Sequence, residues 1–180
     1  MTEQIALLRS WLQHTAHLRA LMGRIAALIV ERGAVHDLSK LNTDEFEGFA
    51  RINRVAREQK FGSPEYEAAM ERERPTIDLH FSRNRHHPER PRLIGEAAER
   101  ERGLPDDATY HYAVAAASME WLDIVEMVCD WRAAQLGYGD TSRTWEQNVE
   151  LNLQKKGQHL NECQAWLARS VARSLEVERG

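Results

Sequence analysis

Apolar residues recur at three- and four-residue steps through most of this chain, and this spacing limits what it can fold into. Steps of this size place apolar side chains on one face of an α-helix, and no segment shows the sustained β-branched alternation of a strand. We therefore predict an all-α fold, a bundle of about five to seven helices. The helical spacing covers residues 3 to 32, ending at Gly33; Thr43, as N-cap, to about 60; 65 to 73; a segment after Pro75; Thr109 to about Leu136; and about Thr144 to Glu178.

The length and composition suit one soluble globular domain. A chain of 180 residues, 42% hydrophobic and 29% charged, has enough apolar surface to bury one core over residues 1–180. No apolar run approaches the ~20 residues that cross a bilayer, and the first residues lack the apolar stretch of a signal peptide. Cys129 and Cys163 form no C-x-x-C pair, which favours buried thiols in a reducing compartment. The sequence predicts a cytoplasmic protein with no membrane contact and with its five tryptophans in the core.

Residues 84 to 108 are the least helical part of the sequence. They hold three of the five prolines and two of the ten glycines. Proline and glycine favour turns, and long loops in compact domains are usually functional or disordered. We therefore predict a long loop between the helix that follows Pro75 and the one that begins at Thr109.

Histidine is unusually frequent, with eight residues, and several of them cluster. Imidazole and carboxylate side chains bind Mn, Zn, Fe, Co or Ni, whereas a structural zinc finger would need paired cysteines. The sequence predicts a site for one or two divalent metal ions. Its candidate ligands are His17, the neighbours His36 and Asp37, His80 with the adjacent His86 and His87, and Asp123 or Asp130.

Three acids, Asp123, Glu126 and Asp130, stand at i, i+3 and i+7, so they share one stripe of a helix. Beside apolar neighbours they would repel one another unless a cation or arginines neutralised them. The alternative interpretation is a solvated helix face, paired with Arg132 or with other arginines. The spacing alone does not choose between the two.

A basic cluster surrounds the adjacent histidines, although the chain has a formal net charge of −4. That bulk charge disfavours nucleic acid as a partner, so an anion must be bound locally. The cluster consists of Arg83, Asn84, Arg85 and Arg90, and it would bind a phosphate or carboxylate group. Lys40, one turn after Asp37, would present a further ammonium group to an anion. The alternative is a solvated loop that is basic by composition alone.

The order of these motifs resembles the HD-domain superfamily, whose H…HD…D pattern binds divalent metal inside an all-α bundle. HDLSK at 36–40 looks like the HD-x-x-K signature, and with NRHHPE at 84–89 and EMVCDW at 126–131 it is similar to a small HD-like family of bacteria and their phages. The resemblance covers about residues 14–135, the expected core, and leaves the C-terminal helix 144–178 outside. It implies His17, His36, Asp37 and Asp130 as the basic ligands, with Asp123 competing for the last place, and His80, His86 and His87 as added ligands of a two-metal site that Asp37 would bridge.

The leading functional hypothesis is a divalent-metal-dependent phosphohydrolase that acts on a nucleotide or another small phosphate ester. Lys40 and Arg85 would counter negative charge on the phosphoryl oxygens, and Glu126 or Glu89 would transfer the proton. The same ligands would also suit an HD-type di-iron oxygenase, and a third hypothesis is a non-catalytic helical protein with a structural metal. HD-type hydrolases are often oligomers, so the resemblance is also compatible with a homo-oligomer.

Overall fold

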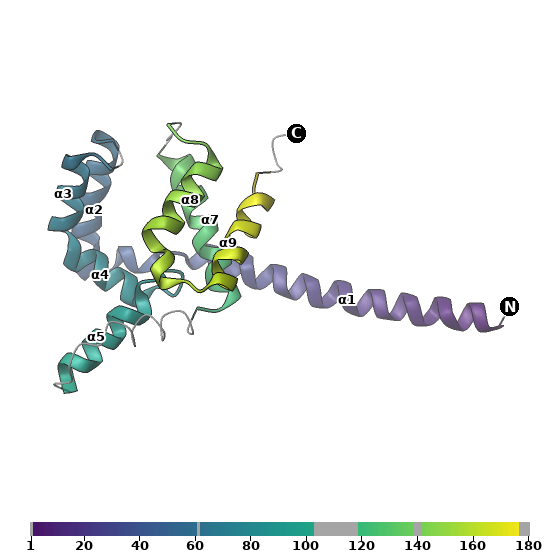
Figure 1. Cartoon of the computed structure of the whole chain (residues 1–180). Helices are drawn as coiled ribbons and strands as arrows, with labels where there is room; N and C mark the ends of the chain where they lie inside the picture. Colours follow the sequence, from purple (N-terminus) through teal and green to yellow (C-terminus); the bar gives the residue numbers. More distant parts are fainter. Residues whose placement is uncertain (1, 61, 103–118, 139–141, 177–180) are drawn as a thin grey trace. The chain divides into compact units, whose positions relative to one another are not determined.

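The computed structural model describes residues 2–60, 62–102, 119–138 and 142–176, and these ranges are all-α. They contain eight α-helices and no strand, which confirms the predicted fold class with slightly more helices than the predicted five to seven. The helices are α1 (Thr2–Val35), α2 (Thr43–Glu58), α3 (Pro64–Arg72), α4 (Arg74–Arg83), α5 (Arg90–Arg102), α7 (Trp121–Gly137), α8 (Trp145–Lys156) and α9 (Glu162–Ser174), with the 3-10 helices η1 (Leu38–Leu41) and η2 (Gly157–His159) (Figure 1).

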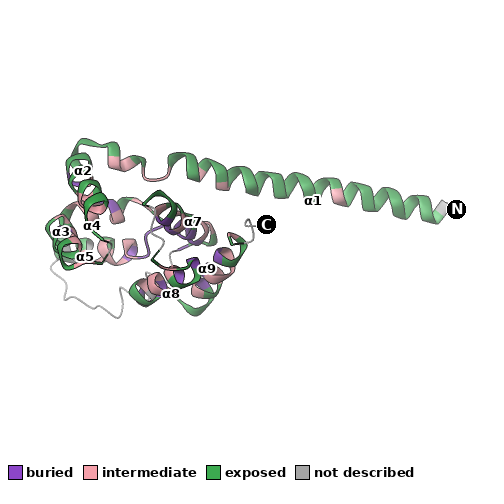
Figure 2. Cartoon of the chain, turned by 90° about the horizontal axis from the view of Figure 1, so that it is seen from above, coloured by how far each residue is buried: buried purple, intermediate pink, exposed green. Residues whose placement is uncertain are grey.

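The chain divides into two units, Met1–His36 and Asp37–Gly180. The first unit is α1, an uninterrupted helix of 34 residues, which is about 51 Å long at 1.5 Å per residue. Its apolar side chains are largely exposed, and Figure 2 shows this exposure along nearly the whole helix. Gly33 does not end α1 as predicted, because a glycine inside a helix costs only about 1 kcal/mol and the helix continues to Val35. The single-domain arrangement over 1–180 stays a prediction.

The first half of the second unit consists of η1 and α2 to α5. Asn42, rather than the predicted Thr43, occupies the N-cap position of α2. α2 packs against α4, and their backbones approach closely at Gly48, which is buried. A Cβ built on Gly48 would lie 2.6 Å from Cγ2 and 2.8 Å from Cβ of Thr76. The absence of a side chain at Gly48 therefore permits this approach.

The long loop predicted at 84–108 is wrong over much of its length. Residues Arg90–Arg102 form α5, so only a turn at 84–89 separates α5 from α4, and residues 103–108 lie outside the described ranges. Pro91 is the second residue of α5, where its missing N–H is harmless because the first N–H groups of a helix have no intrahelical partner. A proline that predicted a loop therefore helps to start a helix, and the segment that carries the two adjacent histidines is short.

The main hydrophobic core of the second unit lies between α7, α8 and α9. Its buried residues are Met119, Ile124, Met127, Val128, Trp131, Trp145, Val149, Leu153, Ala168 and Ala172. The indole N–H of Trp145 donates a hydrogen bond of 2.9 Å to the carbonyl of Ala172, which links α8 to α9. Packing of α8 and α9 against the buried side of α7 holds α7 in place, and α7 carries the predicted acids.

The single C-terminal helix predicted at 144–178 is wrong, because this segment forms two helices, α8 and α9, separated by η2. The side chain of Asn161 accepts a hydrogen bond of 2.9 Å from the backbone N–H of Gln164. The side chain of Gln164 in turn accepts one of 3.0 Å from the backbone N–H of Asn161. Such a capping box marks the start of a new helix. The apolar spacing continues on both sides of the break between α8 and α9, and therefore does not reveal it.

Three further expectations need correction. The helix predicted from Thr109 begins at Trp121 within the described ranges, and residues 109–118 lie outside them. Cys129 and Cys163 are exposed rather than buried. Trp131 and Trp145 are core residues as predicted, but three tryptophans are exposed: Trp11, Trp121 and Trp166. Their helical spacing predicts burial, but among the described residues their exposed fractions are 58%, 48% and 66%.

No helix in the described ranges combines the length and apolar character needed to cross a bilayer. The cytoplasmic location and the homo-oligomer stay predictions.

We expect Gly48→Ala to destabilise the protein by about 1–3 kcal/mol, because the added methyl group forces α2 and α4 apart at Thr76. Urea denaturation followed by circular dichroism measures this change. Gly137→Ala is the matched control, since a Cβ at Gly137 meets nothing within 4 Å. Equal stability of the two variants would show that the approach of α2 to α4 is not tight.

Candidate metal centre

Asp37 begins the second unit in a left-handed backbone conformation. Its φ of 56° and ψ of 17° make it the sole non-glycine residue with positive φ in the described part of the chain. Aspartate tolerates this region better than most residues, but the conformation still costs about 1–3 kcal/mol unless its surroundings hold it. Asp37 directly precedes η1, and its carboxylate meets the imidazoles of the second unit.

Three of the predicted histidines come from the end of α4 and the turn that follows it. His80 lies in the last turn of α4, and His86 and His87 lie in the turn at 84–89; their exposed fractions are 1%, 2% and 7%. Asn84 ends α4, with its side-chain Nδ2 donating to the carbonyl of His80 at 2.8 Å. The backbone N–H of His87 donates to the carbonyl of Asn84 at 3.3 Å. The turn therefore brings the two adjacent histidines back beside His80.

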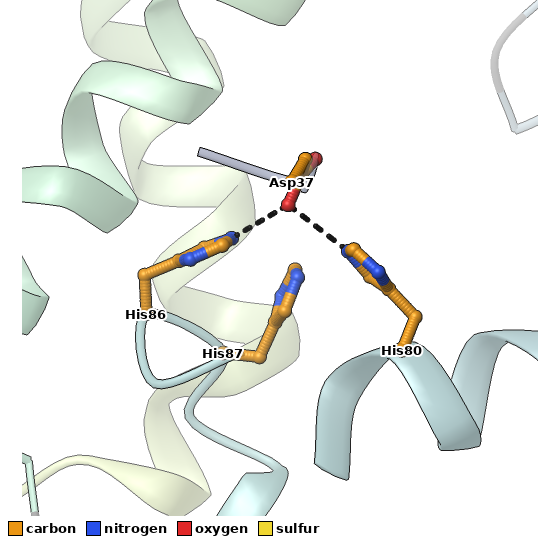
Figure 3. Close-up of side chains that lie close together, drawn as sticks. All are labelled: Asp37, His80, His86 and His87. Atoms are coloured by element: carbon orange, nitrogen blue, oxygen red, sulfur yellow. Dashed lines mark ion pairs between the residues drawn. The ribbon is translucent and has the colours of Figure 1, made fainter. Parts of the chain in front are cut away.

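Figure 3 shows the three imidazoles gathered around the carboxylate of Asp37. Nε2 of His80 lies 3.1 Å from Oδ1 of Asp37, and Nε2 of His86 lies 3.4 Å from the same oxygen. The ring of His87 lies beside both, with centroid distances of 4.1 Å to His86 and 4.9 Å to His80. One possible ligand atom from each of the four residues lies within 4.8 Å of the other three.

The opposite nitrogens of two of these rings face carboxylates. Nδ1 of His80 lies 2.9 Å from Oε2 of Glu45, and Nδ1 of His86 lies 3.2 Å from Oε1 of Glu126. A carboxylate accepts a hydrogen bond from Nδ1–H, and in the neutral ring this leaves Nε2 with the lone pair. In that tautomer the Nε2 lone pairs face an oxygen of Asp37, an arrangement that repels unless a proton or a cation lies between them. The arrangement is the one that metal-binding histidines commonly have.

Glu45 is a fully buried carboxylate that orients His80. Its Oε2 also accepts a hydrogen bond of 3.0 Å from the hydroxyl of Ser39, and its Oε1 accepts one of 2.7 Å from Arg83. Arg83 is shared with Asp44 at 2.6 Å, and this pair raises the pKa of Arg83. A buried charge is tolerated only when it is paired and hydrogen-bonded, and Glu45 meets both conditions.

His87 is held in its neutral form. Burial keeps the pKa of His87 well below its ordinary value, and its neighbours His86 and Lys156 lower it further. Its Nε2 is buried and makes no hydrogen bond to any residue that the structure describes. Phe81 packs beside the ring, with 4.2 Å between the ring centroids. A neutral, buried imidazole with an unused nitrogen has the chemistry of a metal ligand.

The other predicted ligands lie in different surroundings. An oxygen of Asp130 on α7 lies within 4.8 Å of a ring nitrogen of His86. Asp123 instead accepts a hydrogen bond of 2.9 Å from the backbone N–H of Glu120 and two of 3.3 Å from Arg85. The geometry thus supports Asp130 over Asp123 as a ligand. Two further predicted ligands belong to the first unit and stay predictions. His17 is exposed on α1, and His36 is the last residue of the first unit.

The acidic stripe of α7 is not a solvated face, although one of its acids pairs with an arginine, as the alternative interpretation expected. Asp123 is 1% exposed, and Glu126 and Asp130 are partly buried. Arg132 donates to Gln135 at 2.7 Å. A histidine and a different arginine, Arg85, therefore face the stripe.

The four predicted catalytic residues also lie in different surroundings. Lys40 lies at the cluster, with Nζ 2.5 Å from Oδ2 of Asp37, and Glu126 lies behind His86. Arg85 instead pairs with Glu120 at 3.0 Å and with Asp123, at the start of α7.

Glu89 lies next to the cluster rather than within it. Its Oε1 is 3.7 Å from Nζ of Lys156, the lysine whose charge acts on His87. Its Oε2 is buried and has no hydrogen-bond partner among the residues described. No contact between Glu89 and the four residues of the cluster is found in the described part of the chain, and its role in proton transfer stays a prediction.

Sequence reasoning missed the residues that support the histidines, above all Glu45, Ser39 and Asn84. One signal for Glu45 was present. Glu45, Phe49 and Ile52 are spaced at i, i+4 and i+7, so Glu45 extends the apolar row of α2. A charged residue in an apolar row requires a buried partner, and His80 is that partner.

Fold and site together define an all-α protein with a buried cluster of three histidines and one aspartate. The chain belongs to a family of unknown function (DUF5662), whose model matches residues 3–173. No curated protein and no solved structure matches the chain. The resemblance to the HD-domain superfamily therefore stays a prediction.

We expect Glu45→Leu to lower the free energy of unfolding by about 3 kcal/mol or more, because it leaves the buried imidazole of His80 and the partly buried donors of Ser39 and Arg83 without this acceptor. Urea denaturation in the presence of a chelator measures the loss without any contribution from metal. Glu47→Leu is the control on the same helix, since the Glu47 side chain is 84% exposed and its loss should change stability by about 0.5 kcal/mol or less. Similar stability of both variants would contradict the role of Glu45.

Proposed function

We propose that this protein binds a divalent cation between Asp37, His80, His86 and His87 and uses it to hydrolyse a small phosphate ester. One observation carries the proposal: buried imidazole nitrogens converge on a single carboxylate oxygen, while carboxylates hold the far nitrogens of two of the rings. Such a cluster has no packing advantage, since it places electron pairs against one another in the interior. A cation at its centre removes that repulsion.

The distances between donor atoms support this proposal. An ion about 2.0–2.1 Å from each ligand separates neighbouring donors by about 2.8–3.4 Å, with octahedral geometry at the short end and tetrahedral geometry at the long end. The two Nε2–Oδ1 distances, 3.1 and 3.4 Å, fall in this range. Three nitrogens and one oxygen suit Zn, Mn, Fe, Co or Ni. Asp130, near His86, would add a further oxygen or serve a second ion.

A cation in such a site supplies a Lewis acid for a phosphoryl oxygen and a bound water with a pKa lowered toward ~7. The surrounding residues of the chain would do the rest. Lys40, whose ammonium group lies beside Asp37 and above the ring of Phe49, would counter charge on the phosphoryl oxygens. Glu126 would act as a positioning residue for His86, and Glu89 would accept the proton. Arg85 is less suited than Lys40 to contact the substrate, because two carboxylates hold it.

The two alternatives stay distinguishable. A di-iron oxygenase needs about six ligands, which requires Asp130 and the histidines of the first unit as well as the cluster. A structural metal would be coordinatively closed and would leave no position for water. Anaerobic metal analysis separates these proposals, because two irons with oxygen consumption favour oxidation, whereas phosphate release favours hydrolysis.

Saturating divalent metal should raise the melting temperature of the chelator-treated protein by about 5–10 °C, because a ligand at 100 times its Kd adds about 2.7 kcal/mol. Differential scanning fluorimetry with Zn, Mn, Fe, Co and Ni measures the shift. His87→Gln should lose most of it, whereas His14→Gln, on the exposed surface of α1, should keep it. If His87→Gln responds to metal as the unmodified protein does, the cluster is not the site.

Asp37→Asn should lose both bound metal and phosphatase activity, with kcat/KM lower by about 100-fold or more. Lys40→Met should keep its metal and lose about tenfold or more in kcat, since only the charge beside the site is removed. A screen of p-nitrophenyl phosphate and nucleotides with each cation provides the assay, and Lys155→Met on α8 is the lysine control. Full activity of Asp37→Asn would end the proposal.

A further inference from the structure

A pocket of about 490 Å³ lies in the second unit between α2, α3, α7 and α8. This volume is within the range of small-molecule sites. Its wall combines three aromatic side chains, Tyr66, Trp131 and Tyr138, with the amides of Asn148 and Asn152. None of the residues proposed to bind metal lines it, so it is a separate feature of the fold.

The pocket and the proposed metal centre lie along the same two helices. On α2, Glu45 supports the metal centre and Ile52 lines the pocket, and they share one helix row, about 10 Å apart along the axis. On α7, Asp130 lies near His86 and Ala134, one turn later, lines the pocket, about 6 Å further along. Figure 1 shows α2 and α7 running in the same direction, so both helices lead from the metal centre to the pocket.

The two asparagines present a hydrogen-bond donor and an acceptor on neighbouring turns of α8. Nδ2 of Asn152 donates to Oδ1 and to the carbonyl of Asn148, both at 3.0 Å. Within the described ranges this leaves Nδ2 of Asn148 and Oδ1 of Asn152 without a partner. By contrast Gln135, also in the wall, uses both ends of its amide, on Arg132 and on the carbonyl of Arg143. The asparagine pair is therefore the part of the wall that can form hydrogen bonds with the polar edge of a ligand.

The aromatic side chains give the pocket surfaces on which a flat ring can stack. Trp131 is 6% exposed and belongs to the rigid core of α7 to α9, so its position is fixed. Tyr66 and Tyr138 approach from α3 and from the end of α7. Burial, followed by the nearby Tyr138, raises the pKa of Tyr66, so its hydroxyl stays neutral at physiological pH. Flat rings gain about 1–3 kcal/mol from stacking on aromatic residues.

We propose that this pocket binds a planar heterocycle that carries a hydrogen-bond donor and an acceptor on neighbouring edge atoms, as a nucleobase does. Asn148 and Asn152 form hydrogen bonds with the edge of the ring, and the aromatic side chains of the pocket stack on its face. The inference rests on the proposed function in one respect: the ring belongs to the substrate whose phosphate ester reaches the metal centre at the Glu45 end of α2.

The test uses the full-length protein in excess EDTA, so that binding to the pocket does not depend on metal. Adenosine, guanosine, cytidine and uridine are titrated by saturation-transfer NMR and calorimetry, with ribose as the probe that lacks a base. At least one nucleoside should bind saturably, and ribose should not. Asn152→Leu, of similar size, should weaken that binding by about tenfold, because a buried hydrogen-bonding edge loses its partner. Asn148→Leu should do the same.

Asn53→Leu is the matched control, since Asn53 is exposed on α2 and does not line the pocket. Circular dichroism and melting curves establish that each variant folds. The proposal is overturned if no nucleoside binds at millimolar concentration, or if folded Asn152→Leu and Asn148→Leu bind as the unmodified protein does.

Hydrolysis assays separate this inference from the proposed function. Nucleoside binding that Asn152→Leu weakens, in a protein that hydrolyses no phosphate ester with any cation, supports the pocket and rejects the phosphohydrolase. Hydrolysis of simple phosphate esters without nucleoside binding supports the phosphohydrolase and rejects the pocket.

Discussion

The buried carboxylate of Glu45 is the interaction on which the arrangement of the candidate site depends. It accepts hydrogen bonds from Ser39 in η1, two residues after Asp37, from His80 on α4 and from Arg83 one turn later. One side chain of α2 thereby joins two other elements at a single point in the interior. A carboxylate cannot be buried unless all of these partners are in place, so the same contacts that neutralise Glu45 also direct His80 toward Asp37.

In the second unit, α2 and α7 each carry residues of both the proposed metal centre and the pocket. At one end the two helices supply Glu45 and Glu126, which support imidazoles of the cluster. Further along, the same helices line a pocket of aromatic and amide side chains, completed by α3 and α8. α8 contributes to both ends, since Lys156 lies near the histidines and Asn152 lies in the pocket. A helix outside the stretch that resembles the HD-domain superfamily is thus part of both proposed sites.

The sequence predicted the helices better than their ends. Apolar spacing identified α2, α3 and α7, but spacing has no signal for a break whose two sides stay in phase, which is why 144–178 was predicted as one helix. The capping box of Asn161 with Gln164 was visible in the sequence and was the signal to use. Proline led to the opposite error, a loop predicted where the structure has a helix, because Pro91 belongs to the first turn of α5.

The sequence by itself determined the helical fold class and the residue types of the cluster, because both follow from local spacing and from side-chain chemistry. Tertiary structure alone decided which acids and histidines meet. Asp123 and Asp130 lie on one stripe of α7, yet Arg85 faces the first and His86 the second. Partners of this kind come from segments distant in the chain, and only the placement of the turn at 84–89 beside α7 brings them together.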